Sequence, residues 1–114
     1  MVLELIAIAA LQGEPARITS YRSVPEQTDS TPNWTSTGEH VAPGGCAVSR
    51  DLLHGGVPYG TWLYIDGFGL CRVNDTTHPR LRRTVDLWVA THAEEKRVGV
   101  RTLKVYIVPV KRKS

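Results

Sequence analysis

Short apolar runs that glycine and proline interrupt constrain this chain more than any other feature of its sequence. The clearest run, residues 61–65, reads Thr-Trp-Leu-Tyr-Ile, and its β-branched and aromatic side chains suit a pleated strand better than a helix. Most of the ten Gly and seven Pro lie between such runs, where the turns of an all-β domain require them. With 114 residues, the chain has room for one hydrophobic core.

The expected strands alternate with turns along most of the chain. Besides 61–65, strands are predicted at 16–22, 46–49, 70–74, 84–89 and 102–108. A polar stretch at 23–33 predicts a loop. One helix of about two turns is predicted, because Thr91 and Glu94 form a capping-box pattern and Gly99 follows as a stop signal.

These elements predict a small barrel. Several short strands with a single late helix lack the long crossovers that a doubly wound sheet needs, and closing the sheet removes exposed strand edges. We therefore expect an all-β barrel over residues 16–109, a strand or leader remnant at 1–15, and a basic tail at 110–114. The apolar run at 2–11 is too short to span a bilayer, so neither a transmembrane segment nor a clear signal peptide is predicted.

Net charge does not select a binding partner. The formal charge of +3 gives a weak positive field, which attracts any polyanion. Nucleic-acid binding would depend on this charge alone, with no recognised binding module, so no nucleic-acid partner is predicted. The side chains that it would use are Arg80, Arg82, Arg83 and Arg101. The oligomeric state is left open.

The cysteines and histidines do not form a metal-binding pattern. Cys46 and Cys71 allow either one disulfide or two buried thiols, and a bridge would close a loop of about 25 residues and stabilise the fold by about 3 kcal/mol. The four histidines lack a tight ligand spacing, and the two cysteines have no second pair. We expect neither a metal nor a cofactor.

Two aspartates in the second half of the chain are the best candidates for chemistry. Because side chains alternate along a strand, Val85 and Leu87 should share one face. Asp86 then shares the opposite face with Trp88. If that face lines a cleft, partial burial raises the pKa of Asp86, and a neighbouring Asp75 carboxylate raises it further. A carboxyl that is protonated near neutral pH would result.

A series of short motifs connects these aspartates to a known family. The motifs are Thr19-Ser20-Tyr21, Thr35-Ser36-Thr37-Gly38, Ala47-Val48, Pro58-Tyr59-Gly60-Thr61, Asn74-Asp75-Thr76 and Val85-Asp86-Leu87-Trp88. Their order and spacing across residues 17–108 resemble the 3D-domain family, which is named for three aspartates. That family is related to the catalytic barrel of membrane-bound lytic transglycosylase A and to stationary-phase survival-type muralytic proteins.

The resemblance implies a fold and a reaction. The fold would be a six-stranded double-psi β-barrel with one short helix before the last strand. The partner and substrate would be peptidoglycan glycan strands, in the bacterial envelope or secreted, with the protein encoded by a bacterium or a phage. Asp86 would be the catalytic acid and Asp75 a supporting aspartate. One carboxyl then acts as acid and as base to give a 1,6-anhydromuramyl product, whereas ordinary glycoside hydrolysis usually needs two carboxylates.

Other polar and aromatic side chains are candidates for contacts with the sugar. The predicted substrate-binding residues are Thr19, Tyr21, Thr37, Asp51, Thr76 and Trp88. Hydroxyls would hydrogen bond to sugar hydroxyls, and an indole would stack on a pyranose ring or else fill the barrel core.

The sequence also departs from the family pattern. Thr77-His78-Pro79 replaces the glycines that commonly follow the Asp-Thr motif, and Asp51 comes three positions after Val48 instead of directly after it. For Asp51 the alternative is an exposed turn or a helix cap. For the whole chain the alternative is a noncatalytic barrel that binds cell-wall glycan, in which Asp75 and Asp86 accept structural hydrogen bonds.

Overall fold

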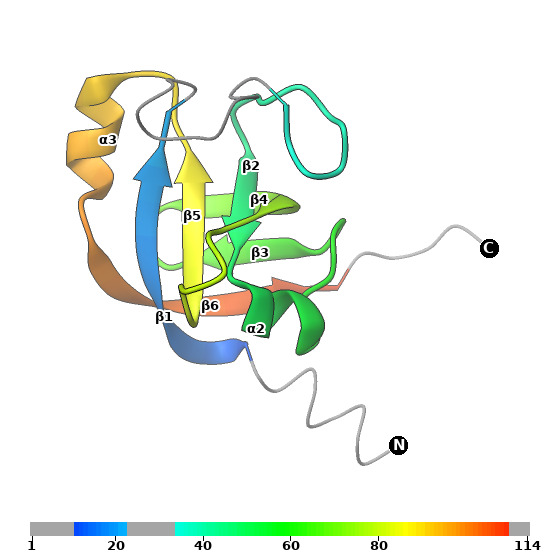
Figure 1. The fold of residues 1–114 in the computed structure, drawn as a ribbon. Helices are drawn as coiled ribbons and strands as arrows, with labels where there is room; N and C mark the ends of the chain where they lie inside the picture. Colours follow the sequence, from blue (N-terminus) through cyan, green and yellow to red (C-terminus); the bar gives the residue numbers. More distant parts are fainter. Residues whose placement is uncertain (1–10, 23–33, 110–114) are drawn as a thin grey trace, which may run out of the picture.

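The computed structural model describes residues 11–22 and 34–109, and these form a closed barrel of six strands (Figure 1). The predictions made for residues 1–10, 23–33 and 110–114 lie outside the described residues. The elements are β1 (Gln12–Tyr21), β2 (Gly45–Val48), α2 (Arg50–His54), β3 (Trp62–Ile65), β4 (Gly69–Thr76), β5 (Thr84–Trp88), α3 (His92–Val98) and β6 (Arg101–Val108).

The strands follow one another around the barrel in the order β1, β5, β2, β4, β3, β6. The pairs β1–β5 and β2–β4 are parallel, and the other neighbours are antiparallel. Parallel neighbours cannot be joined by tight hairpins, so the chain crosses between strands that are distant in sequence. The predicted six-stranded double-psi β-barrel, with a short helix before the last strand, is confirmed.

The barrel core comes from the inward-facing residues of every strand. Ile18, Leu63, Val73, Val85 and Val105 are completely buried, and each belongs to a different strand. Burying an aliphatic side chain of this size contributes about 1.5–3 kcal/mol relative to leaving it exposed.

The first strand begins earlier than the sequence indicated. β1 starts at Gln12 and pairs with β6, with a shift in register between Gln12 and Glu14. Gly13 adopts φ +96° at this bulge, and a Cβ there would lie 3.0 Å from the Tyr106 ring. Glycine and proline in this segment hid the strand, because both residues usually weaken a strand pattern.

Of the two helices in the described residues, one was predicted and one was not. In α3 the Thr91 hydroxyl accepts a hydrogen bond from the backbone N–H of Glu94 at 3.1 Å and donates to the Glu94 carboxylate at 3.0 Å. Gly99 follows with φ +59°, as its stop signal predicted. The short helix α2 has only Leu52 buried, so it carries too little apolar periodicity to be recognised in the sequence.

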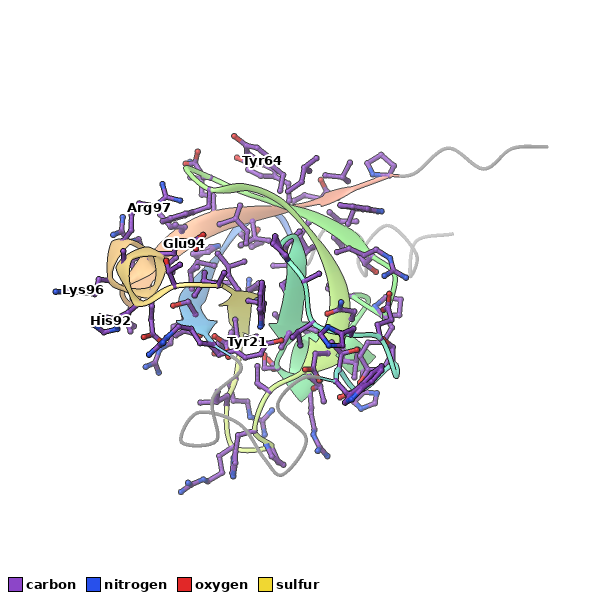
Figure 2. The ribbon with its side chains drawn as sticks, turned by 90° about the horizontal axis from the view of Figure 1, so that it is seen from above. Tyr21, Tyr64, His92, Glu94, Lys96 and Arg97 are labelled. Carbon is purple, nitrogen blue, oxygen red and sulfur yellow. A yellow bond between two sulfur atoms is a disulfide. The ribbon has the colours of Figure 1, made fainter. Side chains whose placement is uncertain are left out.

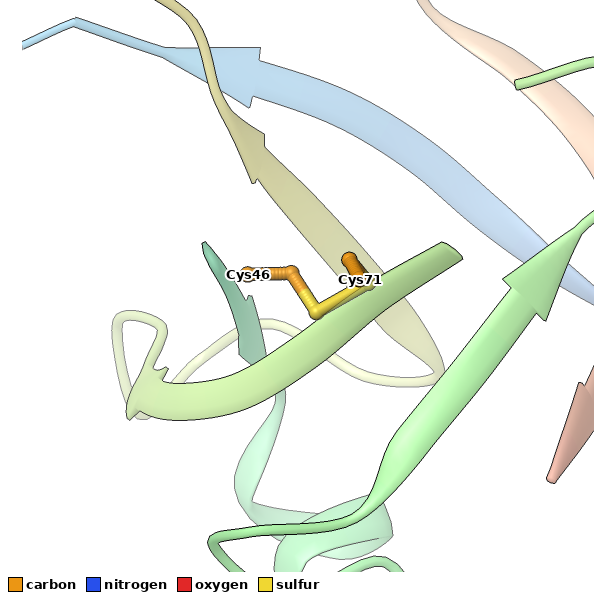
Figure 3. Close-up of a disulfide and its surroundings, with 2 residues drawn as sticks. All are labelled: Cys46 and Cys71. Atoms are coloured by element: carbon orange, nitrogen blue, oxygen red, sulfur yellow. A yellow bond between two sulfur atoms is a disulfide. The ribbon is translucent and has the colours of Figure 1, made fainter. Parts of the chain in front are cut away.

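Cys46 of β2 and Cys71 of β4 form a disulfide between these neighbouring strands (Figure 3). Their Cα atoms lie 5.9 Å apart, and both residues are buried. The bridge ties together two strands that the chain reaches in separate passes, so it restricts the unfolded chain. Among the described helices, none combines the length and the apolar character needed to cross a bilayer.

Candidate active site

Asp86 lies in the middle of β5, between β1 and β2. It pairs with Thr19 on one side and with Ala47 on the other. Val85 is buried in the core, whereas Asp86 is half-buried on the outer face, as the alternation predicted. The Thr19 hydroxyl donates a hydrogen bond of 2.7 Å to Oδ1 of Asp86.

The surroundings of Asp86 favour its protonated form. Burial raises the pKa of Asp86 to about 6, the hydrogen bond from Thr19 works in the opposite direction, and the negative charges of Asp75 and Glu95 raise the pKa further. About half of the molecules then carry a neutral acid at pH 6. A carboxyl in this state can donate a proton and take one back, which general acid–base catalysis requires.

Asp75 stands near the end of β4, two strands away from Asp86. Ala47 of β2 pairs with both aspartates, so the two lie on one line across the sheet. The usual strand spacing places their Cα atoms roughly 10 Å apart. Oδ1 of Asp75 accepts hydrogen bonds from the backbone N–H of Ser36 at 3.1 Å, the Ser36 hydroxyl at 2.5 Å and the backbone N–H of Thr76 at 2.9 Å.

Tyr21 contacts Asp75 from β1. Its hydroxyl donates to Oδ2 of Asp75 at 3.4 Å. Burial raises the pKa of Tyr21 above its usual range, and the charges of Asp75 and Asp86 raise it further. The phenol therefore remains a neutral donor. Thr19 and Tyr21, two residues apart on β1, thus each hold one aspartate.

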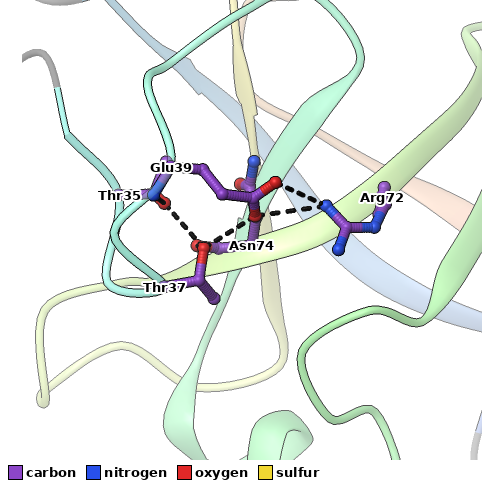
Figure 4. A network of polar contacts seen from close by, with 5 residues as sticks. All are labelled: Thr35, Thr37, Glu39, Arg72 and Asn74. Atoms are coloured by element: carbon purple, nitrogen blue, oxygen red, sulfur yellow. Dashed lines mark hydrogen bonds and ion pairs between the residues drawn. The ribbon is translucent and has the colours of Figure 1, made fainter.

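The loop at residues 34–40 brings Ser36 to Asp75. Glu39 forms an ion pair with Arg72 of β4 at 2.9 Å (Figure 4). The Thr37 hydroxyl bonds to Oε1 of Glu39 at 2.7 Å and to the backbone oxygen of Asn74 at 3.2 Å. Thr37, a predicted sugar ligand, therefore anchors this loop to β4, next to the aspartate that the loop supports.

Two other predicted ligands hold the backbone around the site. The Thr76 hydroxyl donates to the backbone oxygen of Val48 at 2.9 Å. Asp51 accepts the backbone N–H of Arg83 on both carboxylate oxygens, at 3.1 and 3.0 Å. Burial works against the ionised form of Asp51, but hydrogen bonds from Ser49 and from backbone amides lower its pKa overall. Asp51 therefore fixes the turn before β5 and makes no contact with the aspartate pair in the hydrogen bonds of the described residues.

Trp88 borders a cavity that is separate from the two aspartates. The cavity has a volume of about 130 Å³ and lies between α3 and the β3–β4 turn. Trp88 is half-buried and lines it together with Phe68, Leu87 and Val98. Asp75 and Asp86 do not line this cavity.

The sequence did not single out Ser36 or Glu95 as members of the site. Ser36 lies inside one of the family-like motifs, but only the fold brings it to Asp75, 39 residues away. Glu95 lies on α3, where its carboxylate pairs with Arg22 and His92 at 3.2 Å each. Within the described part of the chain, no group of three or more acidic, histidine or cysteine side chains has the arrangement of a metal site.

Comparisons with known proteins bear on the fold. Neither a protein-family model nor a curated protein sequence matches the chain. Among solved structures, the chain is similar to the apo form of an expansin from Clavibacter michiganensis, with a TM-score of 0.58 and 20% sequence identity. The similarity covers 87% of this chain and 52% of the expansin, so the chain spans about half the length of that protein. At this identity, the likeness establishes a shared double-psi barrel fold.

Proposed function

We propose that this protein cleaves peptidoglycan glycan strands as a lytic transglycosylase, with Asp86 as its acid–base group. The observation that carries the proposal is a half-buried carboxyl with a pKa of about 6, held by Thr19 and free of any ion pair among the described residues. The resemblance of the motifs around Asp75 and Asp86 to the 3D-domain family supports the choice of substrate.

In the first step, the neutral Asp86 carboxyl donates its proton to the oxygen that joins N-acetylmuramic acid to the next sugar. The bond from C1 of the muramyl residue to this oxygen breaks, and positive charge develops at C1. The Asp86 carboxylate then removes the proton from the C6 hydroxyl, and the C6 oxygen bonds to C1. The products are a 1,6-anhydromuramyl end and a free hydroxyl on the leaving sugar, and no water is consumed.

Asp75 and Tyr21 would support this chemistry without taking part in proton transfer. The negative charge of Asp75 raises the pKa of Asp86 and favours the positive charge that develops at C1. Tyr21 keeps the Asp75 carboxylate in place through its hydroxyl. Removing either group should lower kcat more than it weakens substrate binding.

The direct test is digestion of purified sacculi, with mass spectrometry of the soluble products. We expect 1,6-anhydromuropeptides from the wild-type protein and at least a hundredfold less product from Asp86→Asn. Asp66→Asn, an exposed acid-to-amide change in the β3–β4 turn, is the matched control and should retain activity. Products with ordinary reducing ends would contradict transglycosylation and indicate hydrolysis.

A second candidate function is noncatalytic binding to cell-wall glycan. It is favoured by the state of Asp75, whose oxygens already accept hydrogen bonds from Ser36, Thr76 and Tyr21 and so have little capacity left for a sugar. In this case the protein would sediment with sacculi and release nothing, and Asp86→Asn would bind as well as the wild type.

We also propose that the protein acts in the bacterial envelope or after secretion. Its disulfide supports this location, because disulfides persist mainly in oxidising compartments. Fractionation of expressing cells, with thiol labelling of Cys46 and Cys71, would test it. We expect the protein in the envelope or medium, with Cys46 and Cys71 joined in a disulfide and therefore unlabelled. Protein in the cytoplasm with both thiols labelled would contradict this location.

A further inference from the structure

We infer that Trp34 is a sugar-binding platform, on which its indole stacks against one pyranose ring of a glycan strand that runs from Asp86 past Asp75. The choice of a glycan strand as the ligand rests on the proposed function. The exposure of the indole, the loop that carries it and its place beside Asp75 support the platform itself.

Trp34 is the most exposed of the three tryptophans. Trp62 and Trp88 are half-buried, whereas 56% of the surface of Trp34 is exposed. Tryptophan is on average a highly buried residue, because its ring system carries a large apolar surface. Covering such a surface with a ligand contributes about 25 cal/mol for each Å² of apolar area that leaves water. A sugar ring stacked on Trp34 would therefore bind favourably.

His40 orients the indole and leaves it open to a ligand. Trp34 and His40 form an isolated β-bridge, and their rings meet edge to face, with centroids 5.2 Å apart and planes at 74°. Because the two rings are not stacked, His40 covers at most one face of the indole. The indole N–H has no hydrogen-bond partner within residues 11–22 and 34–109, so it can donate to a sugar hydroxyl or to an acetamido oxygen.

The loop at residues 34–40 is fixed to the barrel before any ligand binds. The backbone N–H of Thr35 donates to the backbone oxygen of Glu39 at 2.8 Å, which closes the loop on itself. The Glu39 carboxylate pairs with Arg72 of β4 at 2.9 Å, which attaches the loop to the sheet. Binding of a sugar then costs little further ordering, because an indole has only two torsion angles to fix.

The same loop places Trp34 close to Asp75. Ser36 donates to Oδ1 of Asp75 from its hydroxyl at 2.5 Å and from its backbone N–H at 3.1 Å. Tyr21 reaches the other oxygen, Oδ2, from β1, the strand that adjoins Asp86. The loop therefore approaches Asp75 from the side away from β1. Trp34 precedes Ser36 by two positions, so their Cα atoms are about 7 Å apart at most.

A glycan strand fits this arrangement better than a single sugar. The Cα atoms of Asp86 and Asp75 lie roughly 10 Å apart, and Trp34 extends the same line beyond Asp75. One pyranose ring cannot contact all three side chains, whereas a strand of several rings can. The face of a sugar ring carries C–H groups that pack on an indole, and its edge carries hydroxyls that bond to polar groups.

Tyr64 offers a matched control for an exposed aromatic side chain. It is 41% exposed and belongs to β3, which pairs with β4 and β6. Figure 2 shows Tyr64 on the opposite side of the barrel from Tyr21, which contacts Asp75. Tyr64→Ala therefore removes an exposed aromatic ring without changing the proposed platform.

The test measures binding of a glycan octasaccharide, freed of its stem peptides, by titration calorimetry. The full chain carries Asp86→Asn in every sample, so that no strand is cut. We expect Trp34→Ala to weaken binding about fivefold, Trp34→Phe less than twofold, and Tyr64→Ala not at all. In ¹⁵N-labelled protein, the octasaccharide should shift the Trp34 indole signal, which is assigned by its loss in Trp34→Phe. The Ser36 amide signal should be unchanged in Trp34→Ala, which shows that the loop stays on Asp75.

Several results would overturn the inference. They are an unchanged affinity in Trp34→Ala, an equal loss of affinity in Tyr64→Ala, and a Trp34 indole signal that does not respond to the octasaccharide. If Trp34→Ala displaces the loop, the indole signal decides, because it is measured without a change at Trp34. These outcomes are separate from the fate of the proposed function. Cleavage of sacculi with binding that is independent of Trp34 refutes only the platform, and binding that depends on Trp34 without cleavage refutes only the catalytic proposal.

Discussion

Replacing Asp86 by asparagine should stabilise the folded protein at neutral pH while it abolishes the proposed activity. Asparagine keeps the shape of the side chain and an oxygen that accepts the Thr19 hydroxyl, but it cannot ionise. Burial raises the pKa of Asp86 from its ordinary value of 3.8 to about 6. The folded wild-type protein must therefore hold an unfavourable buried charge at pH 7, and the variant avoids it.

The size and pH dependence of this effect follow from proton linkage. Between pH 3.8 and about 6, the unfolded chain has released the Asp86 proton and the folded protein still binds it. Wild-type stability therefore falls as pH rises through this interval and is constant above it. With about 1.4 kcal/mol for each pH unit, the loss amounts to about 3 kcal/mol.

Urea denaturation followed by tryptophan fluorescence measures this difference directly. The free energy of unfolding of Asp86→Asn, minus that of the wild type, should increase by about 2.5 kcal/mol between pH 4 and pH 8, because about 0.5 kcal/mol of the full loss already occurs below pH 4. Asp66→Asn controls for the change from acid to amide at an exposed position. A difference that stays constant with pH, or that decreases as pH rises, would refute the claim that burial keeps Asp86 protonated.

Three further changes test the neighbours of Asp86 and the disulfide. Thr19→Val removes the hydrogen bond that lowers the pKa of Asp86, so the loss of activity at high pH should move to higher pH in profiles of kcat/KM on sacculi. Glu95→Gln removes a charge that raises the pKa of Asp86, so the loss of activity at high pH should move to lower pH. If the pH at which activity is lost is unchanged in both variants, Asp86 is not the titrating acid. Reducing the bond between Cys46 and Cys71, which are 25 residues apart, should lower the free energy of unfolding in urea by about 3 kcal/mol, and a loss below about 1 kcal/mol would contradict a structural role.

Local chemistry in the sequence predicted the strands and the late helix. The Thr91–Glu94 capping box and Gly99 located α3 because a cap needs only residues close in sequence. Alternation in β5 placed Asp86 opposite to Val85, because the side-chain period of a strand is two. Helix α2 was not predicted, since a helix of five residues with one buried side chain has no period to detect.

The contacts of the site depend on the barrel closure, and the sequence carries no local signal for them. Ser36 reaches Asp75 only because residues 34–40 fold onto β4. Asp51 was a predicted substrate contact, yet its oxygens accept the backbone N–H of Arg83. A resemblance in motifs identifies which residue types occur along the chain. It does not predict which groups a carboxylate contacts, because the hydrogen-bond donors come from other parts of the barrel.

The central claim is that Asp86 is a neutral acid at a pH where exposed aspartates are ionised. Titration of its side-chain carboxyl carbon by ¹³C NMR, assigned by the loss of the signal in Asp86→Asn, measures the pKa without substrate. The account predicts a midpoint of about 6. A midpoint below about 4.5, within the ordinary range of aspartate, would contradict it.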